Sequence, residues 1–475
     1  MQNLDTSSFL NQLSAVVGSD QLITDPSSMR PWLTEPRGLY QGAALALVMP
    51  ANTAEVIETV KTCVAANIAI VPQGGNTSLC GAATAMADRQ SIVLNLSRLN
   101  KIRDLDNSAN SLVAEAGCIV ATIQQTAADA NRLFPLSFAA DGSAMIGGAI
   151  GTNAGGTNVL RYGNTRELVS GLEVVLANGD LLDDLRGLRK DNTGYNLSNL
   201  FIGAEGTLGI VTAAKLKLFP TPGQRHTAWL AINQIEDGIE LLNDLQDHSG
   251  GAVSGCELIS ATSQEFVLDY LADVQSPLTA SAPWYLLLEL TGSDRSSLAD
   301  VLEERLSSAL QQGKVRDGVI AQNLQQAETF WRIREAISDA QKPQGGSIKH
   351  DIALPIRKIA EFVTTTLPLL EQSLAGSRPC IFGHLGDGNL HFNVSQPVGM
   401  DPSAFIARWS QFNRLVHDQV EKFGGSISAE HGIGQLKRDE LARYKSPIAL
   451  QLMGQIKRAL DPHNLMNPGK VLPDQ

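Results

Sequence analysis

The sequence predicts an α+β protein that is built from more than one domain. Its 475 residues are too many for one ordinary hydrophobic core, so two or three domains around a shared site are expected. A strand–helix–strand pattern opens the first part, near Leu45, and short strands separated by glycine-rich turns follow it as far as Pro220. Beyond residue 221, apolar strands alternate with amphipathic helices, which is typical of a second α+β domain.

The N-terminus and the overall charge narrow the class of protein. The segment MQNLDTSSFLNQLSAVVGSDQLI has no basic region and no continuous apolar run, so it suits a short amphipathic helix better than a secretion signal. We find no apolar stretch near the roughly 20 residues that span a bilayer, and expect no transmembrane segment. A formal net charge of -12 without a dense Lys/Arg run argues against nucleic acid and anionic membranes as partners.

The cysteines indicate a reducing compartment. Their number is odd, they are spread widely, and none forms a CxxC pair, so we expect free thiols and a cytoplasmic location. The five residues are Cys63, Cys80, Cys118, Cys256 and Cys380.

The first domain, expected at residues 1–222, contains two clear local signals. Residues 52–67 place Val56, Val60 and other apolar residues at helical spacing between the runs ALALVMP and IAIVP, and Asn52 with Glu55 resembles a capping box just after Pro50. Asn178-Gly179 between LEVVLA and DLLDDL predicts a tight β-hairpin.

A second domain is expected at residues 223–425, with a mixed or antiparallel sheet. The predicted strands are AWLAI, GCELI, WYLLLEL and GVIAQ, and helices are expected near residues 236–247, 294–312 and 324–341. Residues 426–475 read as a mainly helical segment that ends in NLMNPGKVLP and packs back on the first domain.

Three glycine-rich segments of the first domain indicate a phosphate-containing ligand. They are VPQGGNTSL at 71–79, the run AADGSAMIGGAIGTNAGGTNVLRYG at 139–163, and FIGAEGTLGIVT at 201–212. Glycine lets backbone N–H groups approach a ligand without a Cβ in the way, although a bland turn explains the first segment equally well. Neither GxGxxG after a first strand nor GxxxxGK[ST] is present, which argues against a nicotinamide Rossmann site and a P-loop.

In sequence order these three segments resemble the two-subdomain FAD-binding domain of the vanillyl-alcohol oxidase type flavoproteins, over roughly residues 40–220. The resemblance implies FAD. Residues 71–81 contain no histidine that could carry the flavin, so we expect the FAD to be non-covalent. The residues expected to bind it are Gly74, Gly75, Asn76, Thr77, Ser78, Asp141, Gly142, Ser143, Gly147, Gly148, Gly151, Thr152, Asn153, Gly155, Glu205, Gly206, Gly209, Ile210, Val211 and Asn467.

A second group of residues indicates a metal site. IFGHLGDGNLHFNV supplies His384 and His391, and SAEHGIG supplies Glu430. Two imidazoles and one carboxylate form a common open site for a divalent first-row metal. A lone histidine is more often an ordinary core or surface residue, but the clustering favours the metal. The spacing is not that of HExxH, so a thermolysin-like enzyme has no motif here.

The motifs GHLGDGNLH, AEHGIG and NPGK together resemble the FAD-dependent D-2-hydroxyacid dehydrogenases, the family of the D-2-hydroxyglutarate and D-lactate enzymes, over nearly the whole chain. This resemblance implies zinc, or else manganese or cobalt, at His384, His391 and Glu430. It also implies a substrate site in the second, cap-like domain. The substrate-binding residues expected there are Arg334, Ser338, Lys349 and Asn393.

The sequence departs from the expected pattern at two positions of this set. Ser338 stands where threonine is expected, and His350 stands where an aromatic residue often follows the lysine. Arg334 and Ser338 are four residues apart on a predicted helix and share one face, which without the resemblance would be an ordinary exposed face.

The expected function is FAD- and metal-dependent oxidation of a D-2-hydroxy acid to a 2-oxo acid, with His431 as the base. Two cations, Arg334 and Lys349, suit a dicarboxylate, so D-2-hydroxyglutarate is expected ahead of D-lactate or glycolate, the substrates of a related dehydrogenase or oxidase. Electron-transfer flavoprotein and quinone are the candidate electron acceptors, and a homodimer stays open. A flavin-free metallohydrolase would use His384, His391 and Glu430 but would leave the glycine-rich first domain unexplained, and a non-catalytic binding protein would not require both groups of residues together.

Overall fold

The computed structural model describes residues 5–295 and 297–473, and the chain divides into two compact units. Unit 1 is made of three stretches of chain and unit 2 of two. Unit 1 takes the chain up to Gly155, residues 163–221 and the chain from Glu430 onward; unit 2 takes residues 156–162 and 222–429.

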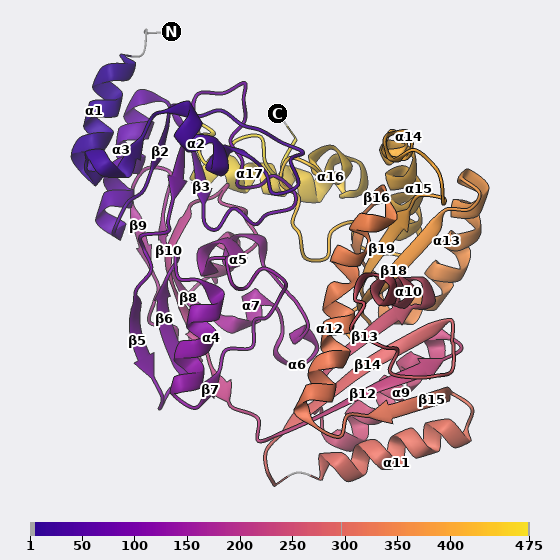
Figure 1. The fold of residues 1–475 in the computed structure, drawn as a ribbon. Helices are drawn as coiled ribbons and strands as arrows, with labels where there is room; N and C mark the ends of the chain where they lie inside the picture. Colours follow the sequence, from indigo (N-terminus) through magenta and orange to yellow (C-terminus); the bar gives the residue numbers. More distant parts are fainter. Residues whose placement is uncertain (1–4, 296, 474–475) are drawn as a thin grey trace. The chain divides into compact units, whose positions relative to one another are not determined.

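A four-stranded mixed sheet forms the N-terminal part of unit 1, in the order β1-β2-β4-β3 (Figure 1). The predicted strand–helix–strand is β2, α3 and β3. Asn52 caps α3 by accepting the Glu55 N–H at 3.0 Å, but the Glu55 carboxylate accepts the Ala51 N–H, so only half of the predicted capping box forms. The elements are α1 Thr6–Val17, η1 Ser19–Gln21, β1 Leu22–Ile23, α2 Pro26–Leu33, β2 Ala46–Val48, α3 Thr53–Ala66, β3 Ala69–Gln73 and β4 Ser91–Asn95.

A five-stranded antiparallel sheet, in the order β5-β6-β10-β8-β9, forms the second part of unit 1. Strands β8 and β9 form the predicted hairpin, and Gly179 in its turn has φ 83°. The elements are β5 Ile102–Asp106, β6 Ser111–Glu115, α4 Val120–Asp129, β7 Arg132–Leu133, α5 Ile146–Thr152, α7 Thr165–Leu168, β8 Val169–Val175, β9 Leu181–Asp183, α8 Ser198–Phe201, β10 Ile210–Lys217 and β11 Phe219–Pro220, then α16 Arg438–Tyr444 and α17 Pro447–Leu460.

An antiparallel sheet is the centre of unit 2, in the order β15-β12-β14-β13-β18-β19-β16, with β17 also paired to β19. The four predicted strands lie in it as β12, β13, β14 and β15. The strands are β12 Gln224–Ile232, β13 Val253–Ser260, β14 Trp284–Gly292, β15 Val315–Ile320, β16 Ser347–Ile348, β17 Asp351–Ala353, β18 Arg378–His384 and β19 Asn389–Ser395.

Helices cover both faces of this sheet (Figure 1). On one face, α10 and α12 bury Phe266, Phe330 and Ile333 against Trp229 and Leu287. On the other, α9 and α11 contact β12, and Gly238 of α9 lies beside Ile232 and Leu286. The helices are α6 Val159–Tyr162, α9 Ile235–Ser249, α10 Ala261–Tyr270, α11 Leu298–Gln311, α12 Leu324–Ala340, η2 Lys342–Gln344, η3 Ile356–Lys358, α13 Ile359–Ser373, α14 Pro402–Ile406 and α15 Trp409–Lys422.

Helices α9, α11 and α12 match the helices predicted from the sequence, whereas α10, α13 and α15 were not predicted. In α13 the cause is Pro368, which lies inside the helix although proline normally interrupts one. The expected helical segment from residue 426 is also only partly helical, because residues 426–437 form a loop before α16.

The bounds of the two units differ from the expected domain bounds at residue 222 and at two short segments. Residues 156–162 belong to unit 2, since α6 packs on β13 and the Arg161 guanidinium donates to the Thr291 hydroxyl at 2.5 Å. Residues 426–429 also belong to unit 2, where Ser426 and Ala353 exchange two backbone hydrogen bonds of 2.7 and 3.0 Å.

Two further expectations were free thiols and the lack of a transmembrane segment. Each of the five cysteines is buried and free of a disulfide. Among the described residues, none of the helices combines the length and the apolar content that crossing a bilayer would require.

Candidate active site

One face of the unit 2 sheet carries ionisable side chains. Glu257 of β13 pairs with His384 of β18, and Phe382 of β18 pairs with His391 of β19. Residues paired across neighbouring strands project from the same face, and this face is the one that α12 covers. The alternation of side chains along three strands therefore brings one carboxylate and two imidazoles together.

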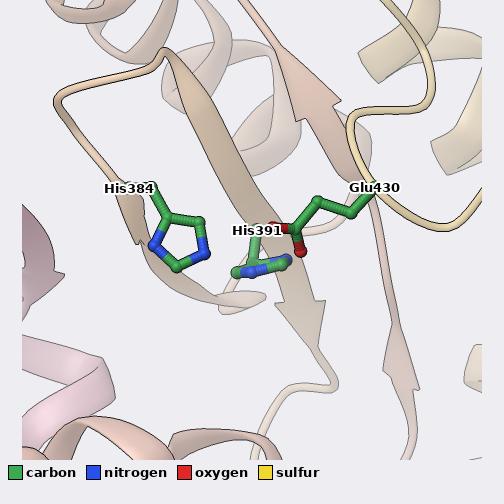
Figure 2. A group of neighbouring side chains, drawn as sticks. All are labelled: His384, His391 and Glu430. Atoms are coloured by element: carbon green, nitrogen blue, oxygen red, sulfur yellow. The ribbon is translucent and has the colours of Figure 1, made fainter. Parts of the chain in front are cut away.

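His384, His391 and Glu430 form a possible metal-binding group, shown in Figure 2. One ligand atom from each lies within 4.8 Å of the others. Glu430 directly follows Ala429, whose N–H donates to the Asp351 carbonyl at 3.3 Å, so chain continuity with unit 2 brings Glu430 to the histidines. His431 comes next and forms a similar group with Asp351 and Glu430.

The donor set fits a divalent metal. The Nδ1 atom of His384 lies 2.7 Å from the Glu257 carboxylate, which directs its other ring nitrogen away from Glu257 as a ligand. Together with His391 and Glu430 this gives two nitrogens and one oxygen, a set that suits zinc and similar ions and leaves coordination positions open.

Arg334 lies beside this group on α12. Its Nε donates to Glu257 at 2.7 Å, and its guanidinium carbon lies 4.8 Å from the centre of the Phe382 ring. Burial of Glu257 by itself raises the pKa of this carboxyl, but its interactions with His384 and Arg334 outweigh burial and lower the pKa to about 2. Glu257 is fully buried and has a hydrogen-bonding partner at each carboxylate oxygen.

The other predicted substrate residues have different surroundings. Ser338 is exposed one turn beyond Arg334 on α12, and Lys349 is exposed between β16 and β17. Asn393 is buried, accepts the His350 N–H at 3.1 Å and donates to Gln341 at 3.1 Å. Asn393 thus orders the backbone beside the predicted substrate residues.

In unit 1 the first two glycine-rich segments pack against one another. A Cβ at Gly75 would lie 2.1 Å from the Ser143 carbonyl oxygen, so only glycine allows this approach. A Cβ at Gly142 or Gly148 would meet none of the neighbouring atoms within 4 Å, so both glycines lie beside open space. Asn76 holds the first loop in place by donating to the Pro31 and Thr34 carbonyls.

Glu205 connects the third segment to the C-terminal motifs of unit 1. Its carboxylate oxygens accept the N–H groups of Ile433 and Gly434, each at 2.7 Å, and its own N–H donates to the Gly151 carbonyl at 2.7 Å. Complete burial raises the pKa of Glu205 to about 6, although these backbone donors favour the charged form. Predicted as a cofactor contact, Glu205 is seen here holding the AEHGIG loop.

Two buried polar atoms of the NPGK motif are unsatisfied among the described residues. The Asn467 side chain donates to the Ala82 and Glu205 carbonyls, but its Oδ1 accepts nothing. Lys470 is 3% exposed, and its ammonium group makes no hydrogen bond. Burial lowers the pKa of Lys470 to about 8. Orphaned polar atoms and open space beside two glycines in one unit fit a large polar cofactor such as FAD.

The remaining predicted cofactor residues lie within the same segments. Gly147 and Gly209 are required by packing, because a Cβ would meet Ala116 at 2.7 Å and Val174 at 2.9 Å. Asn153 ends α5 with φ 51° and accepts the Arg166 N–H at 2.9 Å. The others occupy loops, α5 or the start of β10: Thr77, Ser78, Asp141, Thr152, Gly155, Gly206, Ile210 and Val211.

Glu257 and Asp351 are not among the residues predicted from the sequence, and Lys470 has no predicted role. An acid within the apolar strand GCELI was a usable signal for Glu257, since an acidic residue in a buried strand needs a partner. The lysine of NPGK carried no such signal, because its burial arises from contacts distant in sequence.

Comparisons with known proteins cover both units. A family model described as "FAD binding domain" matches residues 44–184, and one described as "FAD linked oxidases, C-terminal domain" matches residues 221–471. The FAD-binding match removes the support for a flavin-free metallohydrolase.

Curated relatives match along nearly the whole chain. The mitochondrial D-2-hydroxyglutarate dehydrogenase of Arabidopsis thaliana is 38% identical over 458 residues, which cover 96% of this chain and 80% of the relative. The D-2-hydroxyglutarate dehydrogenase of Stutzerimonas stutzeri (strain A1501) is 34% identical, covering 97% and 98%. The mitochondrial enzyme of Bos taurus is 36% identical, covering 95% and 81%.

Solved structures share the fold at low sequence identity. A p-cresol methylhydroxylase with substrate bound has a TM-score of 0.76 at 19% identity, covering 100% of this chain and 98% of that one. The 4-ethylphenol oxidase from Gulosibacter chungangensis has a TM-score of 0.72 at 17% identity, covering 98% and 97%. These matches support the predicted fold of the vanillyl-alcohol oxidase type.

Proposed function

Because the chain belongs to the FAD-dependent D-2-hydroxyacid dehydrogenases, oxidoreductases that act on a CH–OH group, we propose that it oxidises D-2-hydroxyglutarate to 2-oxoglutarate. The observation that carries the proposal is the cluster on one sheet face of unit 2, where Arg334 lies beside His384 and both contact Glu257. A guanidinium next to a metal-binding histidine suits a dicarboxylate substrate, whose hydroxyl and neighbouring carboxylate would lie at the metal and whose second carboxylate would pair with Arg334.

In this proposal unit 1 holds FAD non-covalently. The open space beside Gly142 and Gly148 would admit the cofactor, and the Asn467 Oδ1 and the Lys470 ammonium would bind its polar groups. When bound, FAD supplies the hydride acceptor that no protein side chain can provide. The absence of a histidine from residues 71–81 supports the non-covalent attachment.

His384, His391 and Glu430 would hold the divalent metal, for which zinc leads over manganese and cobalt. When bound, the cation supplies Lewis acidity that lowers the pKa of the substrate hydroxyl. His431, which follows Glu430, accepts the hydroxyl proton at a ring nitrogen. Arg334 pairs with a substrate carboxylate, and Lys349 supplies a second positive charge. Ser338 and Asn393 complete the proposed substrate-binding set.

The electrons leave through a carrier such as electron-transfer flavoprotein or a quinone. Buried free thiols support a reducing compartment, and the cytoplasm is the location we propose.

Anaerobic mixing of the purified protein with D- and L-2-hydroxy acids tests the function. We expect D-2-hydroxyglutarate to bleach the flavin absorbance faster than D-lactate or glycolate, the L-isomers to be inactive, and a chelator to slow the reaction until zinc is restored. Equal rates for D-lactate and D-2-hydroxyglutarate would contradict the substrate, and insensitivity to chelation would contradict the metal.

A further inference from the structure

The Glu257 carboxylate has two partners that the proposed function assigns to different tasks. Its Oε1 lies 2.7 Å from the Nδ1 atom of His384, and its Oε2 accepts the Nε–H of Arg334 at 2.7 Å. The side chain is 0% exposed, so water does not compete for either oxygen. A carboxylate buried this completely needs both partners, because an unpaired buried charge is costly.

We propose that Glu257 is a positioning residue that orients the metal-binding His384 and the substrate-binding Arg334 at the same time. The inference rests on the proposed function, since it takes His384 as a metal ligand and Arg334 as a carboxylate-binding group. It adds that the two subsites share one buried anion, so a change at Glu257 affects both.

On the histidine side, Glu257 selects the tautomer. The 2.7 Å contact with Glu257 Oε1 assigns the ring proton of His384 to Nδ1, because a carboxylate oxygen accepts a hydrogen bond and the imidazole N–H donates it. The lone pair of a neutral imidazole then lies on Nε2, which is the atom left to bind a metal. Carboxylates that hold ligand histidines in this way raise metal affinity in other proteins.

On the arginine side, Glu257 fixes the plane of the guanidinium. The hydrogen bond from Nε–H to Glu257 holds one edge of the guanidinium. One face of the guanidinium lies over the Phe382 ring, with its carbon 4.8 Å from the ring centre. The two terminal nitrogens make no hydrogen bond among the described residues and present a fork of donors. Such a fork binds a carboxylate through two parallel hydrogen bonds when its orientation is fixed in advance.

Glu289 offers a matched control. It lies on β14, is 5% exposed, and projects from the same face of the sheet, because it pairs with Gly255, two residues before Glu257. It also holds one side chain of α12, accepting the Trp331 indole N–H at 2.8 Å. Glu289 touches neither His384 nor Arg334, so Glu289→Gln removes a buried carboxylate of the same kind without reaching either subsite.

The test compares zinc affinity and steady-state kinetics of the full-length, FAD-loaded wild type, Glu257→Gln and Glu289→Gln. Zinc affinity is measured by competition with a chromophoric chelator. We expect the zinc Kd of Glu257→Gln to rise about 10- to 100-fold. Its KM for D-2-hydroxyglutarate at saturating zinc should rise as well, more than kcat falls. Both quantities should change less than about threefold in Glu289→Gln.

Each outcome decides between the inference and its premise. A Glu257→Gln protein that matches the wild type, or an equal loss in both variants, overturns the inference alone. A wild type that binds no zinc overturns the metal of the proposed function together with the inference. If Glu257→Gln does not fold, Glu257→Asp takes its place, since it keeps the charge but is too short to reach both partners; weaker zinc binding and a higher KM support the inference, and unchanged values overturn it.

Discussion

The two units offer a ligand different parts of the chain. In unit 1, the glycine-rich segments present backbone, and their side chains, such as Asn76, mostly bond to neighbouring loops. In unit 2, the sheet face presents ionisable side chains, and Glu257 fixes two of them. Backbone groups suit a large cofactor that is the same in every turnover, whereas side chains can be matched to one substrate.

This difference has a consequence for mutations. A backbone site is sensitive to an added Cβ and tolerant of most side-chain replacements, as the 2.1 Å approach at Gly75 illustrates. A side-chain site loses its chemistry when one group is removed, even though the fold persists. A mutation that abolishes ligand binding in one unit should therefore leave ligand binding in the other unit intact.

The largest expected effect is that of His391→Ala. Removing one of the imidazoles should abolish binding of the proposed metal and lower kcat/KM by about a thousandfold, or about 4 kcal/mol of transition-state stabilisation. The FAD content should stay at the wild-type level, because the cofactor is held by unit 1. Metal analysis and flavin absorbance of the same sample check both statements. A loss of FAD together with the metal would show that ligand binding in the two units is coupled.

A smaller effect is expected for Arg334→Ala, which sharpens the assignment of unit 2 to substrate recognition. Losing a charge-assisted contact should raise the KM for D-2-hydroxyglutarate by about 100-fold. The KM for D-lactate should rise much less, because it has no second carboxylate to bind. Arg332→Ala is the control, since Arg332 lies on the same helix but pairs with the exposed Asp273. Equal increases for both substrates would remove the assignment of Arg334.

The sequence was most informative where chemistry and local pattern coincide. The hairpin at Asn178-Gly179 and helix α12 follow from local rules of turn and period. His384, His391 and Glu430 were chosen because imidazoles and carboxylates in glycine-flanked loops are typical ligands, and the structure brings these three together.

The parts that could not be predicted depend on contacts between distant segments. Glu257 lies 127 positions from His384, and only the pairing of β13 with β18 brings them together. Lys470 reads as an ordinary solvated lysine until the fold buries it. Helix α13 contains Pro368, which by local rules argues against a helix. The helix forms because tertiary packing outweighs the local cost of the proline.

The contribution of Glu205 to stability at different pH values tests how unit 1 holds its loops. Burial raises its folded-state pKa from 4.5 to about 6, so the folded protein binds more protons than the unfolded chain between these values. The stability that this group contributes is thus fully present below pH 4.5 and is lost as the pH rises through about 6. The loss corresponds to about 2 kcal/mol of unfolding free energy.

Urea unfolding of the wild type and Glu205→Gln across this pH range measures the contribution. The variant should lack this component of the pH dependence, since glutamine does not titrate. Parallel curves for the two proteins would mean that Glu205 does not change its protonation state in this window.

The smallest expected effect is that of Lys470→Met, and it separates cofactor binding from folding. If the buried ammonium binds an anionic group of FAD, its loss should weaken FAD binding about tenfold, the value of one charge-assisted hydrogen bond. The same change removes an unpaired buried cation, so the apoprotein should be no less stable than the wild type. Titration of apoprotein with FAD and thermal unfolding of the apoprotein measure the two quantities. A variant that loses stability but keeps its FAD affinity would instead make Lys470 a partner of Glu205 in the fold, because the charge of Glu205 favours the protonated lysine.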